Sequence, residues 1–493
     1  MRKIQLFLVY IFIPFFIYPQ NEIENVTINT ELIKKHIHYL TSEQCDGRGI
    51  ETPGLDSAAN YISASFKLYG LENIKRKDNK DAFYQHFNLY KFYHADNNNA
   101  VICANNQILK LYYDFDPGFE DQTTKTEKAE VIFGYDKDIL DNSMLRGKFI
   151  AILDDINKAK QDSIIEEIRN SGAKGIITIA DNDKKFNPEY VDLKKEVNYD
   201  FSSMLYYLDR TQTTFFKFNM PRSSAAKLFN TNLNSFNKII NLYKQRKKNK
   251  LSGESFSFTF NLPKKTDTIH VKNIIGIIPG SDLNNEFIVI SAHYDHLGKS
   301  KYVYFPGADD NASGVSVLLE NARIFGDLYK KGIYPRRTIV FIAFTAEEQN
   351  LLGSEFLLEK DSIIDKNKIV ANINIDMVGR GSERHSKSPN QLYILGDDFD
   401  TKLLELPDSI NNIHSYLYLD YRYIKDDQKK YFEKSDQFSF IKNNIPSIFF
   451  FGGTHKDLHT PKDTFDKINF SRLEKVTLLT FHTLWAAANI DKL

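Results

Sequence analysis

The composition of the sequence has few of the features that would indicate a disulfide-rich, nucleic-acid-binding or lipid-binding protein. Only two of its 493 residues are cysteines, which is too few for a disulfide framework, and neither has the paired spacing of a zinc knuckle. Lysine plus arginine and aspartate plus glutamate both number 64, so the formal charge is zero. No overall field draws the chain to nucleic acid or to anionic lipid, and we expect no nucleic-acid partner.

Long apolar runs are also scarce. The main one lies at the N-terminus, where Arg2 and Lys3 precede an almost unbroken apolar run from Ile4 to Tyr18. This run is shorter than the roughly 20 residues of a membrane span, and its basic start is typical of a secretory signal peptide. We therefore expect residues 1–20 to be a signal peptide, and the mature chain to be periplasmic or extracellular with no stable membrane insertion.

The rest of the chain has ordinary globular composition, and its length suggests more than one domain. Helical periodicity occupies residues from about 27 to 93, and short β-like runs follow between about 98 and 250. After Val271, buried strands alternate with helices, which predicts a mostly parallel, doubly wound α/β sheet. Cys45 and Cys103 would then lie in different domains, which argues against a disulfide between them.

Metal-ligand chemistry is concentrated at the expected ends of these later strands. The apolar run Phe287–Ala292 is followed at once by His293 and Asp295. Further acids and histidines follow other expected strands or loops, namely Asp309, Asp310, Glu347, Glu348, Asp376 and His459. Charged groups beside buried strands must be paired or bind metal, because burying them alone costs roughly several kcal/mol.

The type of ligand narrows the choice of metal. Imidazole and carboxylate groups without thiolate suit Zn²⁺ or a similar divalent ion. A single catalytic zinc ion needs about three protein ligands. Candidate ligands come from five places in the chain, so they fit two ions that share one aspartate better than they fit one ion.

Five motifs carry a resemblance to a known family. They are Ala-His293-Tyr-Asp295-His-Leu-Gly, Gly-Ala-Asp-Asp310-Asn-Ala-Ser-Gly, Phe-Thr-Ala-Glu347-Glu348-Gln-Asn-Leu-Leu-Gly-Ser, Asn374-Ile-Asp376-Met-Val-Gly-Arg and Leu458-His459-Thr-Pro-Lys-Asp-Thr. Together they resemble the di-zinc aminopeptidase family, which includes bacterial leucyl aminopeptidases, glutamate carboxypeptidase, the transferrin receptor and the glutaminyl cyclases. The turn-rich segment Asp46–Gly54 extends the resemblance towards the N-terminus.

The resemblance implies a set of ligands for two zinc ions per chain. Asp310 would bridge the two ions. His293 and Asp376 would complete the protein ligands of one ion, and Glu348 and His459 would complete those of the other.

The resemblance also implies roles for the neighbouring residues. Glu347 would be the general base, and Asp295 would hydrogen-bond the outer nitrogen of His293 and fix its tautomer. Asp309 is expected to be structural, and His296 and His455 are expected to be neighbours of ligands rather than ligands.

The implied domain organisation has an insertion. Residues 21–97 and 251–493 would form the zinc aminopeptidase catalytic domain, and residues 98–250 would form a smaller, β-rich protease-associated domain. One departure from many relatives is Gln437, which stands where they have histidine after Ser435 and Asp436.

The function expected from the resemblance is that of an exported zinc-dependent exopeptidase. It would remove N-terminal residues from peptides or proteins, using water activated by two zinc ions and Glu347 as the base. Two alternatives are a glutaminyl cyclase-like acyl transferase and a catalytically silent, receptor-like binding protein. The inserted domain argues against the first, and the retained ligands and base argue against the second. The sequence does not indicate the preferred N-terminal residue or the oligomeric state.

Overall fold

The structure is a computed structural model of the chain. It describes residues 20–74, 83–93, 101–111, 113–117, 123, 125–134, 142–154, 158–180, 206–209, 215–262, 265–299, 303–385, 388, 390–396, 401–423 and 431–493. The signal peptide predicted at residues 1–20 lies outside these ranges except for its last residue. Among the helices of the described ranges, none combines the length and the apolar character that a membrane span requires.

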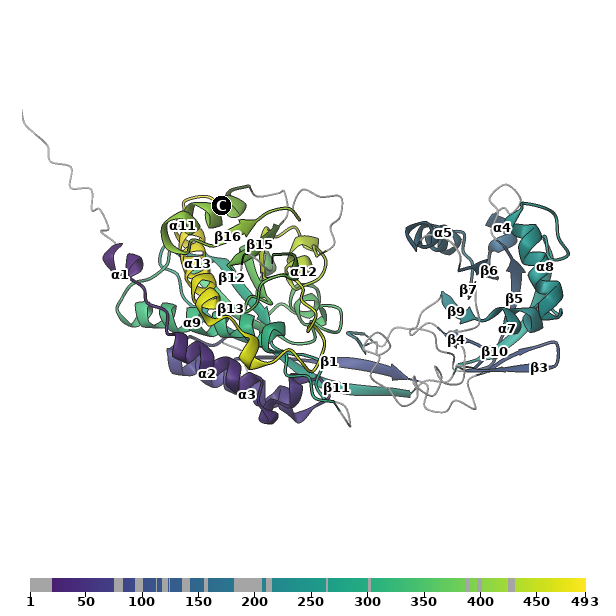
Figure 1. Cartoon of the computed structure of the whole chain (residues 1–493), viewed down its shortest axis with the longest axis horizontal. Helices are drawn as coiled ribbons and strands as arrows, with labels where there is room; N and C mark the ends of the chain where they lie inside the picture. Colours follow the sequence, from purple (N-terminus) through teal and green to yellow (C-terminus); the bar gives the residue numbers. More distant parts are fainter. Residues whose placement is uncertain are drawn as a thin grey trace, which may run out of the picture. The chain divides into compact units, whose positions relative to one another are not determined.

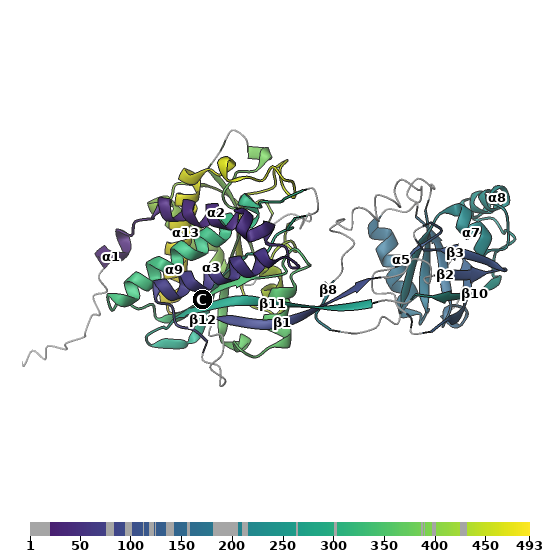
Figure 2. The same cartoon turned by 90° about the horizontal axis from the view of Figure 1, so that it is seen from below.

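The chain forms two compact units (Figures 1 and 2). Unit 1 consists of Met1–Phe87 and Val271–Leu493, and unit 2 consists of Asn88–His270. The chain passes between the units inside strands β1 (Tyr84–Tyr93) and β11 (Lys265–Ile278). The insertion expected at residues 98–250 therefore lies within unit 2. Both limits of unit 2 fall inside a strand, so no change of sequence pattern marks them.

Unit 1 is built on a mixed sheet with the strand order β16-β15-β17-β14-β12-β13-β11-β1-β8, in which the last strand, β8 (Tyr206–Tyr207), pairs with the part of β1 that belongs to unit 2. Its other strands are β12 (Leu283–His293), β13 (Arg337–Phe344), β14 (Ile369–Asp376), β15 (Gln391–Gly396), β16 (Tyr418–Asp420) and β17 (Ser447–Phe451). The four central strands β13, β12, β14 and β17 are parallel, whereas β11 and β15 run antiparallel to their neighbours β13 and β17. The predicted α/β class is confirmed, with antiparallel strands flanking a parallel centre.

Helices cover both faces of this sheet. One group packs around α9, as Figure 2 shows. On the other face, α12 packs on β14 and β17. The group around α9 (Gly314–Lys330) contains α2 (Thr30–Leu40), α3 (Pro53–Tyr69) and α13 (Phe470–Asn489). The remaining helices of unit 1 are α1 (Gln20–Glu24), α10 (Leu352–Glu355), α11 (Thr401–His414) and α12 (Gln437–Lys442), with short turns η1 (Glu43–Arg48), η3 (Ala308–Ser313), η4 (Phe356–Lys360), η5 (Lys366–Lys368), η6 (Glu383–His385) and η7 (Phe465–Lys467).

The core of unit 1 follows from the alternation of side chains along its strands. Val289 of β12 packs in a buried cluster with Phe440 of α12. On β13, Phe341 contacts Phe325 of α9, which in turn contacts Phe481 of α13. Because both faces are buried, the polar groups of the central strands are brought to the strand ends, where the loops leave the sheet.

Unit 2 has a sheet of its own with the order β3-β2-β10-β5-β6-β7-β9-β4. Its strands are β2 (Val101–Ala104), β3 (Gln107–Lys110), β4 (Asp116–Pro117), β5 (Glu127–Phe133), β6 (Phe149–Leu153), β7 (Gly175–Ile179), β8 (Tyr206–Tyr207), β9 (Phe216–Met220) and β10 (Ser255–Asn261), and its helices are α4 (Asn142–Leu145), α5 (Lys158–Asn170), α7 (Arg222–Leu228) and α8 (Leu233–Lys244). Two hydrophobic clusters cover the sheet, one containing Ile168 of α5 and the other containing Phe236 of α8. Unit 2 therefore has its own core.

The two cysteines, Cys45 in unit 1 and Cys103 in unit 2, are free thiols.

Candidate metal centre

The site forms where the parallel strands of unit 1 end. β12 ends at His293 and β14 ends at Asp376, while Glu347 lies three residues after the end of β13. Asp310 lies in the loop that leads into α9, and His459 follows β17. Carboxyl ends of parallel strands meet at one edge of a sheet, so five separate segments can contribute to a single site.

The first group of donors surrounds His293. Its Nε2 atom lies 3.2 Å from Asp376 Oδ1, 3.5 Å from Asp310 Oδ1 and 3.9 Å from Glu347 Oε2. His293 and Asp376 are buried, so these groups face one another with little competition from water.

The second group surrounds Glu348. His459 Nε2 lies 3.3 Å from Glu348 Oε2 and 3.1 Å from Asp310 Oδ2. His296 Nδ1 lies 2.7 Å from Glu348 Oε1 and 3.6 Å from Asp310 Oδ2. His459 is about half exposed, which puts it at the rim of the site, whereas His296 is buried.

Asp310 connects the two groups. Its Oδ1 atom faces His293, and its Oδ2 atom faces His459 and His296. A carboxylate that directs its two oxygens to two donor groups has the geometry required of a bridging ligand.

The donor atoms fit divalent metal ions. Two groups, one of His293, Glu347 and Asp376 and one of His296, Asp310 and Glu348, each offer atoms that all lie within 4.8 Å of one another. In the described part of the chain, the ion-pair partners of these four acids are all histidines. With no lysine or arginine to balance them there, buried carboxylates are suited to a cation held by oxygen and imidazole donors.

The site shifts the proton affinities of its members strongly. Burial raises the pKa of Asp295 to about 7 and that of Glu347 well above its ordinary value. Burial also opposes ionisation of Glu348, but His459 and His296 outweigh it and hold the pKa of this carboxyl well below its ordinary value. Burial works against the charged form of His459, yet Glu348 and Asp310 raise its pKa to about 11. Shifts in opposite directions within one cluster are typical of functional sites.

Several turns at the site hold ordinary residues in a left-handed backbone conformation. Ala346 has φ 57°, Met377 has φ 53° and His459 has φ 54°. Such conformations cost roughly 1–3 kcal/mol at non-glycine residues and persist only where the surroundings fix them. They turn the chain sharply just before Glu347 and just after Asp376, and at His459 itself, so that these side chains converge.

Asp295 makes a different contact from the one predicted. His293 Nδ1 donates to the main-chain carbonyl of Asp295 at 3.2 Å, and the nearest oxygen of the Asp295 carboxylate is 3.8 Å away. The carboxylate instead accepts from the main-chain N–H groups of Glu347 at 3.2 Å and Glu348 at 3.3 Å. The carboxylate bonds to these two amides rather than to His293 because the turn after β13 directs both N–H groups towards the loop after β12. Asp295 therefore supports both sides of the site, but its side chain positions the glutamates.

A second layer of polar groups supports the loop of Asp310. Asp309 accepts from the N–H of Gly379 at 2.7 Å and pairs with His455 at 3.1 Å. Asp463 accepts from the N–H groups of Asp309 at 2.9 Å and Asp310 at 3.0 Å. Asp309 and His455 thus bind each other. Asp463, for which no role was predicted from the sequence, holds the main chain at the candidate ligand Asp310.

Gln437 belongs to a buried polar network beneath the site. Asn374 of β14 donates to Gln437 at 3.2 Å and to Ser435 at 2.9 Å, and accepts from Ser291 of β12 at 2.8 Å. Gln437 in turn donates to the carbonyl of Phe432 at 2.8 Å. These bonds hold β12, β14 and the start of α12 together. Ser291 and Asn374 lie two residues before His293 and Asp376, at which the two strands end.

The structure brings together all five predicted ligands and the predicted base. It also brings His296 against Glu348 and Asp310, where the sequence analysis expected only a neighbour in sequence. The spacing of three residues from His293 is the only sequence signal for this contact, and it is weak because the intervening loop has no regular period.

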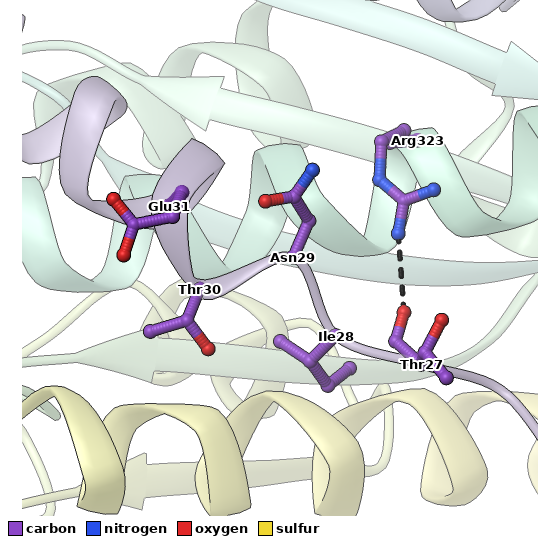
Figure 3. A pocket seen from close by; sticks show the side chains of 6 residues that line it. All are labelled: Thr27, Ile28, Asn29, Thr30, Glu31 and Arg323. Atoms are coloured by element: carbon purple, nitrogen blue, oxygen red, sulfur yellow. Dashed lines mark hydrogen bonds between the residues drawn. The ribbon is translucent and has the colours of Figure 1, made fainter.

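A separate pocket lies at the start of α2 (Figure 3). It has a volume of about 470 Å³ and is lined by Thr27, Ile28, Asn29, Thr30, Glu31 and Arg323. Arg323 donates to the carbonyl of Thr27 at 3.3 Å and to Glu320 and Asp327, so its charge is already balanced. None of the lining residues belongs to the donor groups described above.

Comparison with known proteins finds relatives among the peptidases. Aminopeptidase YwaD of Bacillus subtilis (strain 168) is 30% identical over 228 residues, which cover 45% of this chain and 46% of the relative. A probable zinc metalloprotease of Pyrenophora tritici-repentis (strain Pt-1C-BFP) is 40% identical over 130 residues, covering 26% and 29%. The chain thus spans between about a quarter and a half of the length of these two curated relatives.

Solved structures and a family profile extend the comparison. An aminopeptidase from Aneurinibacillus sp. strain AM-1 has the same fold, with a TM-score of 0.57 and 19% identity over 96% of this chain and 97% of that one. Residues 273–484 match peptidase family M28, and this range contains every predicted ligand and the predicted base. The resemblance to the zinc aminopeptidase family that the five motifs predict is confirmed by this match to peptidase family M28.

Proposed function

We propose that the protein is a zinc-dependent aminopeptidase that hydrolyses N-terminal residues from peptides or proteins. The observation that carries this proposal is the position of Asp310 between two groups of imidazole and carboxylate donors, with one oxygen directed at each. The match of residues 273–484 to peptidase family M28 and the names of the relatives support the same activity.

Two zinc ions fit the donor set better than one. His293 and Asp376 would hold one ion, Glu348 and His459 would hold the other, and Asp310 would bridge them. Bound there, zinc would supply Lewis-acid chemistry, polarising the scissile carbonyl and lowering the pKa of a water molecule.

Glu347 is the residue proposed to move the proton. It follows the strained turn at Ala346, its main-chain N–H is held by Asp295, and its side chain approaches His293. Burial raises its pKa well above the ordinary value, which makes its carboxylate a stronger base. Glu347 would accept a proton from the attacking water and pass it to the leaving amine.

Export and the inserted domain are further parts of the proposal. The basic start and apolar run of residues 2–18 support export to the periplasm or the extracellular space. For unit 2, the succession of α5 and the short buried strand β7 supports a protease-associated domain.

The decisive test is the Glu347→Gln substitution in the full chain. The amide keeps the size of the side chain but cannot take a proton, so hydrolysis of aminoacyl anilides should fall by roughly 10²–10⁴-fold with unchanged zinc content. The matched control is Glu359→Gln, at an exposed glutamate of η4, which should retain full activity. Near-normal activity of Glu347→Gln, or activity that survives complete removal of zinc, would contradict the mechanism.

Two further measurements separate the alternatives. Metal quantification should give two zinc ions per chain, and digestion of a peptide library read by mass spectrometry should show stepwise loss of N-terminal residues. Loss of ammonia from N-terminal glutamine without peptide cleavage would indicate the cyclase alternative. Zinc binding without any turnover would indicate the receptor-like one.

A further inference from the structure

Arg48 is a fully buried arginine of the N-terminal segment, outside residues 273–484. It occupies the end of η1, between α2 and α3. In the described part of the chain, all hydrogen bonds of its guanidinium go to main-chain carbonyls. The acceptors are Leu40 at 2.6 Å, Pro306 at 2.8 Å, Tyr294 at 2.9 Å, Gly307 at 2.9 Å and Asp310 at 3.3 Å.

Four of these five carbonyls belong to the two loops that carry candidate ligands. Tyr294 follows His293, and the other three lie in the loop of Asp310. A buried guanidinium is costly unless its donors are satisfied and opposite charge is near. Here each donor of the guanidinium has a carbonyl acceptor, and carbonyl oxygens carry the partial negative charge that a buried cation needs.

The main chain around Arg48 is fitted closely against the loop after β12. The N–H of His296 donates to the carbonyl of Arg48 at 3.1 Å, and the N–H of Gly298 donates to that of Gly47 at 2.9 Å. A Cβ atom on Gly47 would lie 2.2 Å from the carbonyl oxygen of Gly298, so only glycine allows this approach. The N-terminal segment is therefore bonded directly to the loop of His293 and His296.

The loop of Asp310 is held from its other side by Asp463. Arg48 binds the carbonyl of Asp310, and the Asp463 carboxylate accepts from the N–H of the same residue at 3.0 Å and from that of Asp309 at 2.9 Å. The two peptide groups that flank the Asp310 side chain are thus fixed by a buried cation and a buried anion. With both fixed, the direction in which the Cα–Cβ bond of Asp310 leaves the main chain is fixed as well.

We propose that Arg48 and Asp463 are positioning residues of the metal centre, which orient Asp310 so that each carboxylate oxygen meets one metal ion. This inference rests on the proposed zinc site at Asp310. It makes the N-terminal segment part of that site, and it predicts that zinc affinity depends on a residue that touches no metal.

The test is zinc affinity measured on the full-length Arg48→Lys protein by competition with a chromophoric chelator. Lysine keeps the charge but cannot span the five carbonyls. We expect zinc binding to weaken by about 10–100-fold, the range found when groups that orient metal ligands are removed. In excess zinc, kcat should fall while KM changes by less than about twofold, because the reacting groups rather than substrate contacts are displaced.

The matched control is Arg337→Lys. Arg337 is also buried and donates to main-chain carbonyls, those of Ala487 and Ile490, but it lies at the start of β13, the end of that strand opposite to Glu347. This variant should lose thermal stability and keep the zinc affinity of the wild type. Equal weakening of zinc binding in both variants would assign Arg48 a general structural role and overturn the inference.

A second variant covers the case in which Arg48→Lys does not fold. Asp463→Asn removes the charge that holds two amides, and it should also weaken zinc binding by about tenfold or more. Wild-type zinc affinity in a folded Arg48→Lys or Asp463→Asn protein would overturn the inference while leaving the proposed function intact. Failure of the wild-type protein to bind zinc would instead overturn the proposed function.

Discussion

Asp310 is the residue on which the two donor groups depend. Its side chain faces His293 on one side and His459 on the other, and its own peptide groups are bonded to Arg48 and Asp463. Among the described donors, no other acid combines side-chain contacts to both donor groups with main-chain bonds to a buried arginine and a buried aspartate. A small displacement of this residue would therefore change both halves of the site at once.

The imidazoles of the site hold protons that a metal ion must displace. Carboxylates outweigh the effect of burial and raise the pKa of His459 to about 11 and that of His293 well above its ordinary value. Both rings are therefore protonated at neutral pH before zinc binds, and zinc needs them neutral. We expect zinc binding at pH 7 to release protons, and the apparent affinity to rise by up to about tenfold per pH unit for each proton released.

Titration calorimetry in buffers of different ionisation enthalpy measures these protons. The His459→Asn protein should release about one proton fewer than the wild type. His38→Asn, at an exposed histidine of α2, should release the same number as the wild type. Binding heats that do not depend on the buffer would contradict the proton content assigned to the site.

The sequence predicts the ligands far better than it predicts what supports them. His293, Asp310, Glu347, Glu348, Asp376 and His459 each follow a recognisable strand or motif, so their residue types and positions carry the information. The contacts of His296 and Arg48 depend on the paths of irregular loops. Arg48 also donates to main-chain carbonyls, which every residue has. The residue types of its partners therefore do not indicate these contacts.

At the scale of elements, α2 and α3 flank the segment that carries Arg48. They are joined by His36 of α2, whose ring nitrogens bond to the hydroxyl groups of Tyr61 at 2.8 Å and Tyr69 at 3.1 Å. Its ring is buried between the two helices, and burial lowers its pKa to about 3.

Because the folded state binds the proton on His36 less well than the unfolded state, acid should weaken this interface. The stability that neutral His36 provides is complete above its unfolded pKa near 6.5 and is lost as the pH falls from there towards 3, at roughly 1.4 kcal/mol per pH unit. The His36→Asn protein should be less stable than the wild type at pH 7.5, and the gap should narrow by about 2 kcal/mol at pH 5.

Urea denaturation at the two pH values measures this gap, and His38→Asn on the exposed side of the same helix serves as the control. A gap between wild type and His36→Asn that stays constant with pH would show that His36 does not carry the acid sensitivity.

The element patterns explain which strands could be predicted. Apolar runs such as Phe287–Ala292 indicate strands buried on both faces, and β12, β13 and β17 contain such runs, whereas β14 alternates apolar residues with Asn372 and Asn374. β1 mixes aromatic and polar residues and β11 is 14 residues long, so neither shows where the chain leaves unit 1. Domain limits inside continuous strands are not visible in composition.

At the scale of the whole molecule, the two units have separate hydrophobic cores. In unit 2, Phe149 of β6 packs against Phe216, Phe218, Phe258 and Phe260. In unit 1 the clusters lie around the mixed sheet, and all candidate metal ligands belong to that unit. Each unit therefore has what it needs to unfold as a cooperative body of its own.

This division predicts two transitions in scanning calorimetry that respond to different changes. A ligand that binds only the folded state at 1,000 times its dissociation constant stabilises it by about 4.1 kcal/mol, so removal of zinc should lower the Tm of the unit 1 transition by several degrees. Phe149→Leu should lower only the other transition, because it removes packing of roughly 1–3 kcal/mol from the unit 2 core. If chelation and Phe149→Leu shift the same transition, the metal centre and the aromatic core belong to one cooperative body, and the assignment of the zinc-dependent stability to unit 1 alone is wrong.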